Sequence, residues 1–295
     1  MKLLWLLGLL LLPAPLWAGT QVNSPRVETG PIVDGKGTDE VWKSTLPVLI
    51  TDRTSNETIL LRSVHTDDRV FFLVQYPDKA ENRLHEPWIW NESERKYVEG
   101  PHREDTFVFK WNMMSKDVNL SNFSDDDYRA DVWYWKANRS DPVGHADDKM
   151  QILSSTPGEK MANGGEANEA KKLISFTGKE RYLRRISDSG QGTYRKLQAP
   201  QQKTDQVINR FLPLQPVGSR ADVKARGEWS NGFWFIEFSR KLRTGHDDDC
   251  QFSIGKPILF GVSIFSLYGN ELDRTSPNFY GMGRISEPLR LHLLE

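Results

Sequence analysis

The stretch DVWYWKA, residues 131–137, places two tryptophans and a tyrosine in consecutive positions and follows them with a lysine. Successive side chains point to opposite faces of a β-strand. Trp133 and Trp135 therefore share one face, whereas Tyr134 and Lys136 share the other. The pattern predicts either an ordinary strand of a β-sandwich, with Lys136 reaching solvent, or a strand that lines the cavity of a flat ligand.

Other short segments carry strand signals as well. Each is an aromatic, β-branched or alternating apolar run that is bounded by turn-forming residues. These segments are residues 70–76, 106–112, 233–240, 257–267 and 289–294. We find no long amphipathic helix and no internal repeat. Short strands separated by turns predict an all-β fold, an antiparallel β-sandwich.

One long segment has a different composition. Residues 154–172 are mainly Gly, Glu, Asn, Ala and Lys with almost nothing apolar, and the polar character continues to about residue 206. Such a stretch inside a domain is usually a functional or disordered loop. We interpret residues 154–206 as a polar, mostly irregular insertion over one end of the sandwich. The strands on either side are too few for two cores, so residues 19–295 are predicted to form a single domain.

The N-terminus predicts export. A positive residue, Lys2, precedes an apolar run over residues 3–12, and prolines and a small residue follow up to Ala18. This is the pattern of a secretory signal peptide over residues 1–18. The apolar run is shorter than the ~20 residues that span a bilayer. We therefore expect a periplasmic or exported protein, with a retained N-terminal anchor as the alternative.

Composition narrows the function classes. The formal net charge is -1, which predicts no whole-molecule attraction to nucleic acid or to an anionic membrane. Membrane contact is then expected only through a partner or an uncleaved signal. A single cysteine, Cys250, excludes an internal disulfide, a C-x-x-C-H haem attachment site and an iron–sulfur cluster. The common nucleophile, zinc-protease and nucleotide motifs are absent. Their absence does not exclude an enzyme, but it favours a non-catalytic protein.

Two histidines have acidic neighbours. His145 lies in a turn-like stretch and is followed by Asp147 and Asp148. Because a carboxylate can orient an imidazole for ligation, His145 is a candidate metal ligand, although a structural or surface role is the alternative. The run GHDDDC, residues 245–250, resembles a metal loop. Successive residues of an extended chain cannot all face one ion, so a solvated turn is expected there.

Three segments together carry a family resemblance. They are ADVWYWKANRSDPVGHADD, RRISDSGQGTY and GEWSNGFWFIEFSRKLRTGHDDDCQF. They resemble the haem-binding domain related to the gamma subunit of ethylbenzene dehydrogenase, also described as the cytochrome c-552 and DMSO reductase-like haem-binding domain. The segment DGKGTDEVW is similar to the start of the wider carbohydrate-module-9-like superfamily. The resemblance implies a periplasmic, immunoglobulin-like β-sandwich that binds haem b. It also implies electron transfer beside a molybdenum enzyme or a cytochrome.

The resemblance also implies a methionine and a lysine as axial ligands. Met113 and Met114 are the nearest methionines before the tryptophan strand, and Lys241 and Lys136 are the candidate lysines. His145 is a further candidate. Some relatives carry C-x-x-C-H before the tryptophan strand. This chain has no cysteine there, so any haem is expected to be non-covalent.

A b-type haem also needs an apolar slot and a cation for each propionate. Trp133 and Trp135, with Trp111 and Phe109, are candidates for the slot. Arg139 and Arg240 are candidates for the propionates, which they could meet through paired donors.

Two rival functions remain open. The same sandwich could be a non-redox binding module whose tryptophans stack on sugar rings, or an assembly partner without a cofactor. Sugar binding requires exposed aromatic rings, whereas haem binding requires aromatic rings that are buried around a slot.

Overall fold

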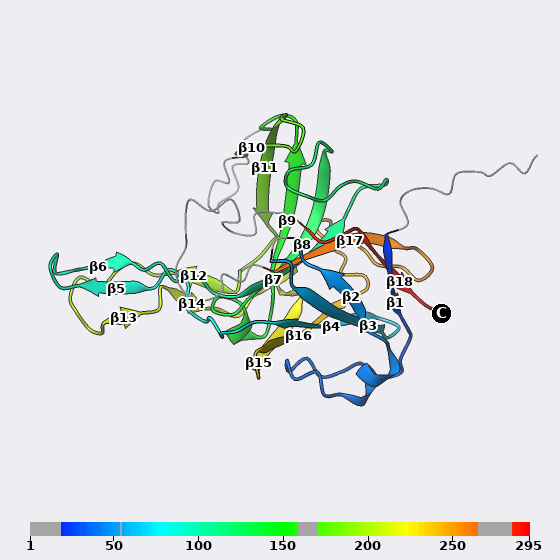
Figure 1. Ribbon diagram of the computed structural model, residues 1–295, viewed down its shortest axis with the longest axis horizontal. Coiled ribbons are helices and arrows are strands. Elements are labelled where there is room, and N and C mark those ends of the chain that lie inside the picture. The colour runs from blue at the N-terminus through cyan, green and yellow to red at the C-terminus, as the bar shows by residue number, and fades with distance from the viewer. Residues whose placement is uncertain (1–18, 54, 159–169, 265–284) are drawn as a thin grey trace, which may run out of the picture.

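The computed structural model describes residues 19–53, 55–158, 170–264 and 285–295 (Figure 1). Within these ranges the regular structure is β-strand apart from three short 3-10 helices, η1 (Glu40–Ser44), η2 (Asp141–Val143) and η3 (Gly218–Ala221). No helix in the described ranges has the length and apolar character needed to cross a bilayer. The predicted signal peptide, residues 1–18, lies outside the described residues.

The larger sheet has eight strands in the order β1-β18-β17-β7-β8-β9-β11-β10. All neighbours in it are antiparallel except β1 and β18. Its strands are β1 (Thr20–Ser24), β7 (Thr106–Asn112), β8 (Tyr128–Lys136), β9 (Asp147–Ser154), β10 (Lys171–Ile174), β11 (Glu180–Ser187), β17 (Ile258–Ile264) and β18 (Leu289–Leu293). The DVWYWKA segment forms most of β8 and lies in the middle of this sheet.

The smaller sheet has five antiparallel strands in the order β15-β16-β4-β3-β2. These are β2 (Val48–Thr51), β3 (Thr58–His65), β4 (Arg69–Pro77), β15 (Lys224–Ser230) and β16 (Phe233–Lys241). A separate three-stranded arm projects from the body of the molecule (Figure 1). It consists of β5 (Trp88–Asn91), β6 (Lys96–Glu99) and β13 (Val207–Ile208), and β12 (Tyr194–Lys196) pairs with β14 (Phe211–Pro213) at its base.

The main core lies between the two sheets. Alternation in β7 and β8 turns Phe109, Trp111 and Trp133 inward, where they meet Phe72 and Phe238 of the smaller sheet. All five side chains are fully buried. Burial of apolar surface on both inner faces stabilises the sandwich. The antiparallel β-sandwich that the alternation predicts is therefore confirmed.

The polar region 154–206 contributes strands of its own. β11 pairs with β9 and extends the larger sheet, while β10 forms its edge. Residues 159–169 lie outside the described ranges. Strand pairing uses backbone hydrogen bonds and does not require apolar side chains on a solvated face, so a polar composition does not exclude strands here.

Candidate binding sites on the two faces of the larger sheet

The two tryptophans of β8 are core residues. Trp133 packs against Trp111, with ring centroids 5.0 Å apart, and Trp135 packs edge-on against Trp234 at 4.8 Å. Nε1 of Trp135 donates a hydrogen bond of 2.9 Å to Asp141. Trp133 and Trp135 are both 0% exposed. The inner face around them is therefore a packed aromatic core, and these two tryptophans form neither a haem slot nor an exposed platform for a sugar.

The candidate axial ligands are not brought together. Met113 follows β7, and its backbone N–H donates to the carbonyl of Arg129 at the start of β8. His145 lies beyond the other end of β8, where its Nδ1 is 2.8 Å from the carbonyl oxygen of Val143. At 3.3 Å per residue, β8 is roughly 25 Å long. Met113 at one end of β8 and His145 beyond the other end are therefore too far apart to bind the same iron.

The other candidates on these segments have separate surroundings. Met114 packs on the outer face of the larger sheet, and its Sδ accepts from the backbone N–H of Arg129 at 3.3 Å. Lys241 ends β16 and is exposed, whereas Arg240 beside it points inward. Arg240 is fully buried and pairs with Asp131. A buried guanidinium that already has a carboxylate partner does not offer itself to a propionate.

A cavity of about 370 Å³ lies on the opposite, outer face of the larger sheet. We call it the outer cavity. Alternation turns Tyr134 and Lys136 of β8 toward it, on the face opposite the tryptophans. Lys149 of β9 and Arg185 of β11 reach it from the next two strands, and Tyr194 of β12 closes one side. Segments far apart in sequence thus build one pocket on β8.

The outer cavity is rich in positive charge. Its cationic side chains are Arg103, Lys136, Arg139, Lys149, Lys171 and Arg185, against the carboxylates of Glu86 and Glu104. Arg139 pairs with Glu104. The remaining wall includes aromatic and aliphatic groups, among them Phe123 and Leu183. A concave, partly apolar site with excess cations suits a ligand that is both apolar and anionic.

Lys136 is held at the floor of this cavity by charge and by rings. Its ammonium pairs with Asp147 and lies 5.3 Å from the ring of Tyr134 and 5.1 Å from the ring of Tyr194. Burial lowers the pKa of Lys136, although Asp147 opposes that shift. Lys136 in turn lowers the pKa of the Tyr194 phenol. Of the sequence-predicted residues, Lys136 and Arg139 are therefore brought together in one pocket.

His85 also lines the outer cavity, and sequence analysis did not identify it. Its ring centroid is 5.5 Å from that of Phe211, and Nδ1 is 3.5 Å from Glu104 Oε1. Burial, together with the positive charge of Arg139, holds the pKa of His85 well below its usual range. The imidazole is therefore neutral, the form that binds metals. His85 is in an irregular segment more than fifty residues before Lys136, so no local pattern connects the two.

The run GHDDDC is only partly a solvated turn. Asp247 is exposed, but Asp249 and Cys250 are buried. Asp249 lies 3.4 Å from Arg240 in the interior. The expectation of a solvated turn is therefore wrong for the second half of the run, because the chain bends inward to place a carboxylate beside a buried cation.

Two solved structures with carbohydrate-related names are similar to the chain. One is a carbohydrate binding module family 9 from Caldicellulosiruptor kristjanssonii in complex with cellotriose, 10% identical, with a TM-score of 0.38, covering 93% of this chain and 94% of that one. The other is a putative carbohydrate-binding protein from Bacteroides uniformis, 7% identical, with a TM-score of 0.42, covering 93% and 100%. At identities this low, the ligands of these proteins do not indicate which ligand this chain binds.

A search of curated proteins gives no match. The family described as ethylbenzene dehydrogenase matches residues 14–276, which include β8, the outer cavity and the aromatic core. The chain therefore belongs to the ethylbenzene dehydrogenase family.

Proposed function

We propose that this chain is an exported, haem b-binding electron-transfer subunit of a redox-enzyme complex, and that the haem binds in the outer cavity. Membership in the ethylbenzene dehydrogenase family supports a role beside a redox enzyme. The observation that carries the location is the position of the His85 imidazole on the wall of a cation-rich pocket.

The residues of the outer cavity fit the chemical needs of a non-covalent haem. His85 offers a nitrogen ligand to iron. Lys171 and Arg185, which also line the cavity, offer charge-assisted hydrogen bonds to propionates. Tyr134 and Leu183 offer apolar contact to the macrocycle. The bound group would supply one-electron chemistry. The described residues that line the outer cavity include no methionine, so we propose His85 in place of Met113 or Met114.

The test is the visible spectrum of the full chain from a haem-replete host. We expect Soret and α bands in the wild type, and their loss or a shift in His85→Ala. His145→Ala is the matched control, because His145 is also half-buried but lies outside the cavity lining, and its spectrum should equal that of the wild type. Acid–acetone extraction should separate the colour from the polypeptide, because the lone Cys250 cannot attach haem covalently.

Other results would contradict specific parts of the proposal. If Met113→Ala, Met114→Ala or Lys241→Ala abolishes the bands and His85→Ala does not, the haem lies elsewhere. If the wild type takes up no haem from the host or from added haemin, the redox function is refuted. A non-redox binding module or a cofactor-free assembly partner would then be the better interpretation. Export is tested separately by fractionation, since full-length protein found only in the cytoplasm would contradict it.

A further inference from the structure

Four aspartates gather on the inner face of the larger sheet, beside the aromatic core. Asp148 lies opposite Trp133 in the β8–β9 register, so its side chain also points inward. Asp131 is two residues before Trp133 and shares its face. Asp188 follows Ser187, the last residue of β11, and continues the register opposite Asp148. Asp249 arrives from the segment after β16. We call these four residues the buried aspartate cluster, because each is at most 5% exposed.

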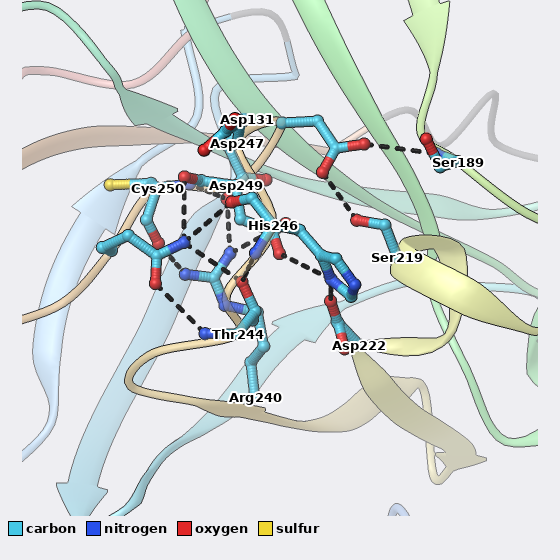
Figure 2. Close-up of polar contacts among 12 residues, drawn as sticks. Asp131, Ser189, Ser219, Asp222, Arg240, Thr244, His246, Asp247, Asp249 and Cys250 are labelled. Carbon is cyan, nitrogen blue, oxygen red and sulfur yellow. Dashed lines mark hydrogen bonds and ion pairs between the residues drawn. The ribbon is translucent and has the colours of Figure 1, made fainter.

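The nearest cation to this cluster is Arg240. Its guanidinium is 2.5 Å from Asp131 and 3.4 Å from Asp249 (Figure 2). The guanidinium carbon also lies 4.9 Å from the ring of Trp133 and 4.5 Å from the ring of Phe252, which fix its position. Arg220 also acts on Asp188, but its guanidinium pairs with Asp147 outside the cluster. Arg240 alone does not balance the cluster if the carboxyl groups are ionised.

Two of the four carboxyl groups have no hydrogen-bond partner. Both oxygens of Asp148 and both oxygens of Asp188 are buried without a partner among the described residues. Asp188 interacts electrostatically with Asp131 and Asp249, which shows that it belongs to the same cluster. Buried polar groups are almost always satisfied in folded proteins, and buried charges are paired or coordinate metals. Four orphaned oxygen atoms in one place therefore indicate a ligand.

The spacing of the oxygens fits one ion. A carboxylate oxygen from each of Asp131, Asp148 and Asp249 lies within 4.8 Å of the other two. Ca²⁺ binds oxygen ligands at 2.3–2.6 Å, so two ligands on opposite sides of the ion are about 5 Å apart. All the side-chain donors are carboxylates, which hard divalent cations prefer.

The loop that carries Asp249 is anchored on both sides. Asp248 accepts hydrogen bonds from the backbone N–H of Ser189 and from the Ser219 hydroxyl. The backbone N–H of Cys250 donates to Asp131 (Figure 2). These contacts hold Asp249 against the larger sheet without using its own carboxylate. The side chain is thus positioned before any ion arrives, which lowers the entropic cost of binding.

We propose that the buried aspartate cluster is a Ca²⁺ site, with Asp131, Asp148 and Asp249 as ligands and Asp188 completing the negative shell. The ion links β8 and β9 of the larger sheet to the segment that leaves β16 of the smaller sheet. Its role is structural, because it lies on the face of the sheet opposite the outer cavity.

Protonation is the competing account of the same geometry. Burial and the neighbouring carboxylates raise the pKa of Asp148, and they raise those of Asp188 to about 9 and Asp249 to about 7. Without a cation these groups would hold protons near neutral pH. A bound divalent ion would reverse that outcome by favouring the ionised carboxylates.

Calorimetric titration of the full chain with Ca²⁺, after EDTA treatment, tests the proposal. We expect one site in the wild type and a melting temperature that rises with Ca²⁺ and falls again with EDTA. Asp148→Asn should abolish the heat of binding and the Ca²⁺-dependent shift. Asp247→Asn is the matched control, since Asp247 is an exposed aspartate of the same loop, and it should bind as the wild type does.

A further variant separates this site from a neighbouring surface group. Asp222, His246 and Asp249 also bring their ligand atoms within 4.8 Å of one another. If Asp222→Asn abolishes Ca²⁺ binding and Asp148→Asn does not, the ion lies at the surface and the proposal is overturned. It is also overturned if the wild type binds no Ca²⁺. A raised melting temperature of Asp148→Asn would then show that a buried, unpartnered carboxyl group at this position destabilises the fold.

Discussion

At the scale of single residues, buried polar groups decide where segments dock. Glu237 of β16 is 0% exposed, yet its carboxylate accepts three hydrogen bonds. They come from Trp42 Nε1 at 2.7 Å and from the backbone N–H groups of Asp34 and Gly35 at 3.0 and 2.8 Å. The DGKGTDEVW segment is therefore fastened to the smaller sheet through one carboxylate. The buried Glu237 carboxylate holds this segment only when all three donors are present, because an unpaired buried carboxylate would be destabilising.

We expect Trp42→Ala to destabilise the protein by about 3–5 kcal/mol, because it empties a buried site. Glu237→Ala should cost about 2–3 kcal/mol, because it leaves buried donors unsatisfied. Urea unfolding of both single variants and the double variant measures these effects. The free energy of unfolding of the double variant should fall by less than the sum of the two single effects, because the two side chains share a hydrogen bond.

Lys43→Ala is the control for this pair. Lys43 is exposed and makes only a surface ion pair with Glu40, so its removal should change the free energy of unfolding by less than about 0.5 kcal/mol. Strict additivity of the Trp42 and Glu237 effects would show that the anchor does not act as a unit.

At the scale of secondary-structure elements, β15 and β8 approach closely at one glycine. A Cβ added to Gly227 would lie 2.3 Å from Cζ2 of Trp135. The backbone N–H of Gly227 donates to Asp141 at 2.7 Å, and Asp141 also accepts from Trp135. The second tryptophan of DVWYWKA is therefore fixed both by packing against a strand of the other sheet and by a carboxylate.

Gly227→Ala should destabilise the protein by about 1–3 kcal/mol, because a methyl group would force Trp135 or β15 to shift. Thermal unfolding and the near-ultraviolet circular dichroism of tryptophan report the two effects. Lys224→Ala, at an exposed position of the same strand, should leave both signals at wild-type values. An unaltered melting temperature in Gly227→Ala would show that the strands separate more easily than the structure indicates.

At the scale of the whole molecule, two opposite electrostatic environments share one sheet. The outer face carries the cation-rich cavity, and the inner face carries the buried aspartate cluster around Arg240. Strand alternation separates them, because Lys136 and Asp131 leave β8 on opposite faces. A formal net charge of -1 therefore conceals two strongly charged sites of opposite sign.

The aspartate cluster makes stability depend on pH when no cation is present. The pKa values of Asp188 and Asp249 are raised to about 9 and about 7. A carboxyl group whose folded-state pKa is raised contributes stability below its unfolded pKa and loses it as pH rises through the folded value. The charged groups that act on these two carboxyl groups come from several elements. They are Asp131, Asp148, Asp222, Asp248, Arg220, Arg240 and His246.

We therefore expect the free energy of unfolding in EDTA to fall by about 1–3 kcal/mol from pH 7 to pH 9. His65 and His85, whose pKa values are lowered mainly by burial, are neutral in the folded state and mostly neutral in the unfolded state over this window. Their contribution is therefore small. Urea titrations at each pH, with and without Ca²⁺, measure the effect. Ca²⁺ should flatten the dependence, and a pH-independent stability in EDTA would contradict the raised pKa values.

The sequence by itself determined the all-β fold and the strand that organises it. Period-two alternation is a local property, so DVWYWKA predicted its own strand, and similar runs predicted β4, β7 and β16. The single Cys250 excluded an internal disulfide and a C-x-x-C-H haem attachment site without any structure. The family resemblance that rests on these same segments is confirmed by the family match.

Only the tertiary structure decided which face of each strand is covered and which residues meet. Alternation groups Trp133 with Trp135 but does not say whether a second sheet or a ligand covers them. His85 meets Lys136 across about fifty residues of sequence, and Asp131 meets Asp249 across more than a hundred. Such contacts arise from strand order and sheet packing, which depend on all the strands together, so no local pattern could place the outer cavity or the buried aspartate cluster.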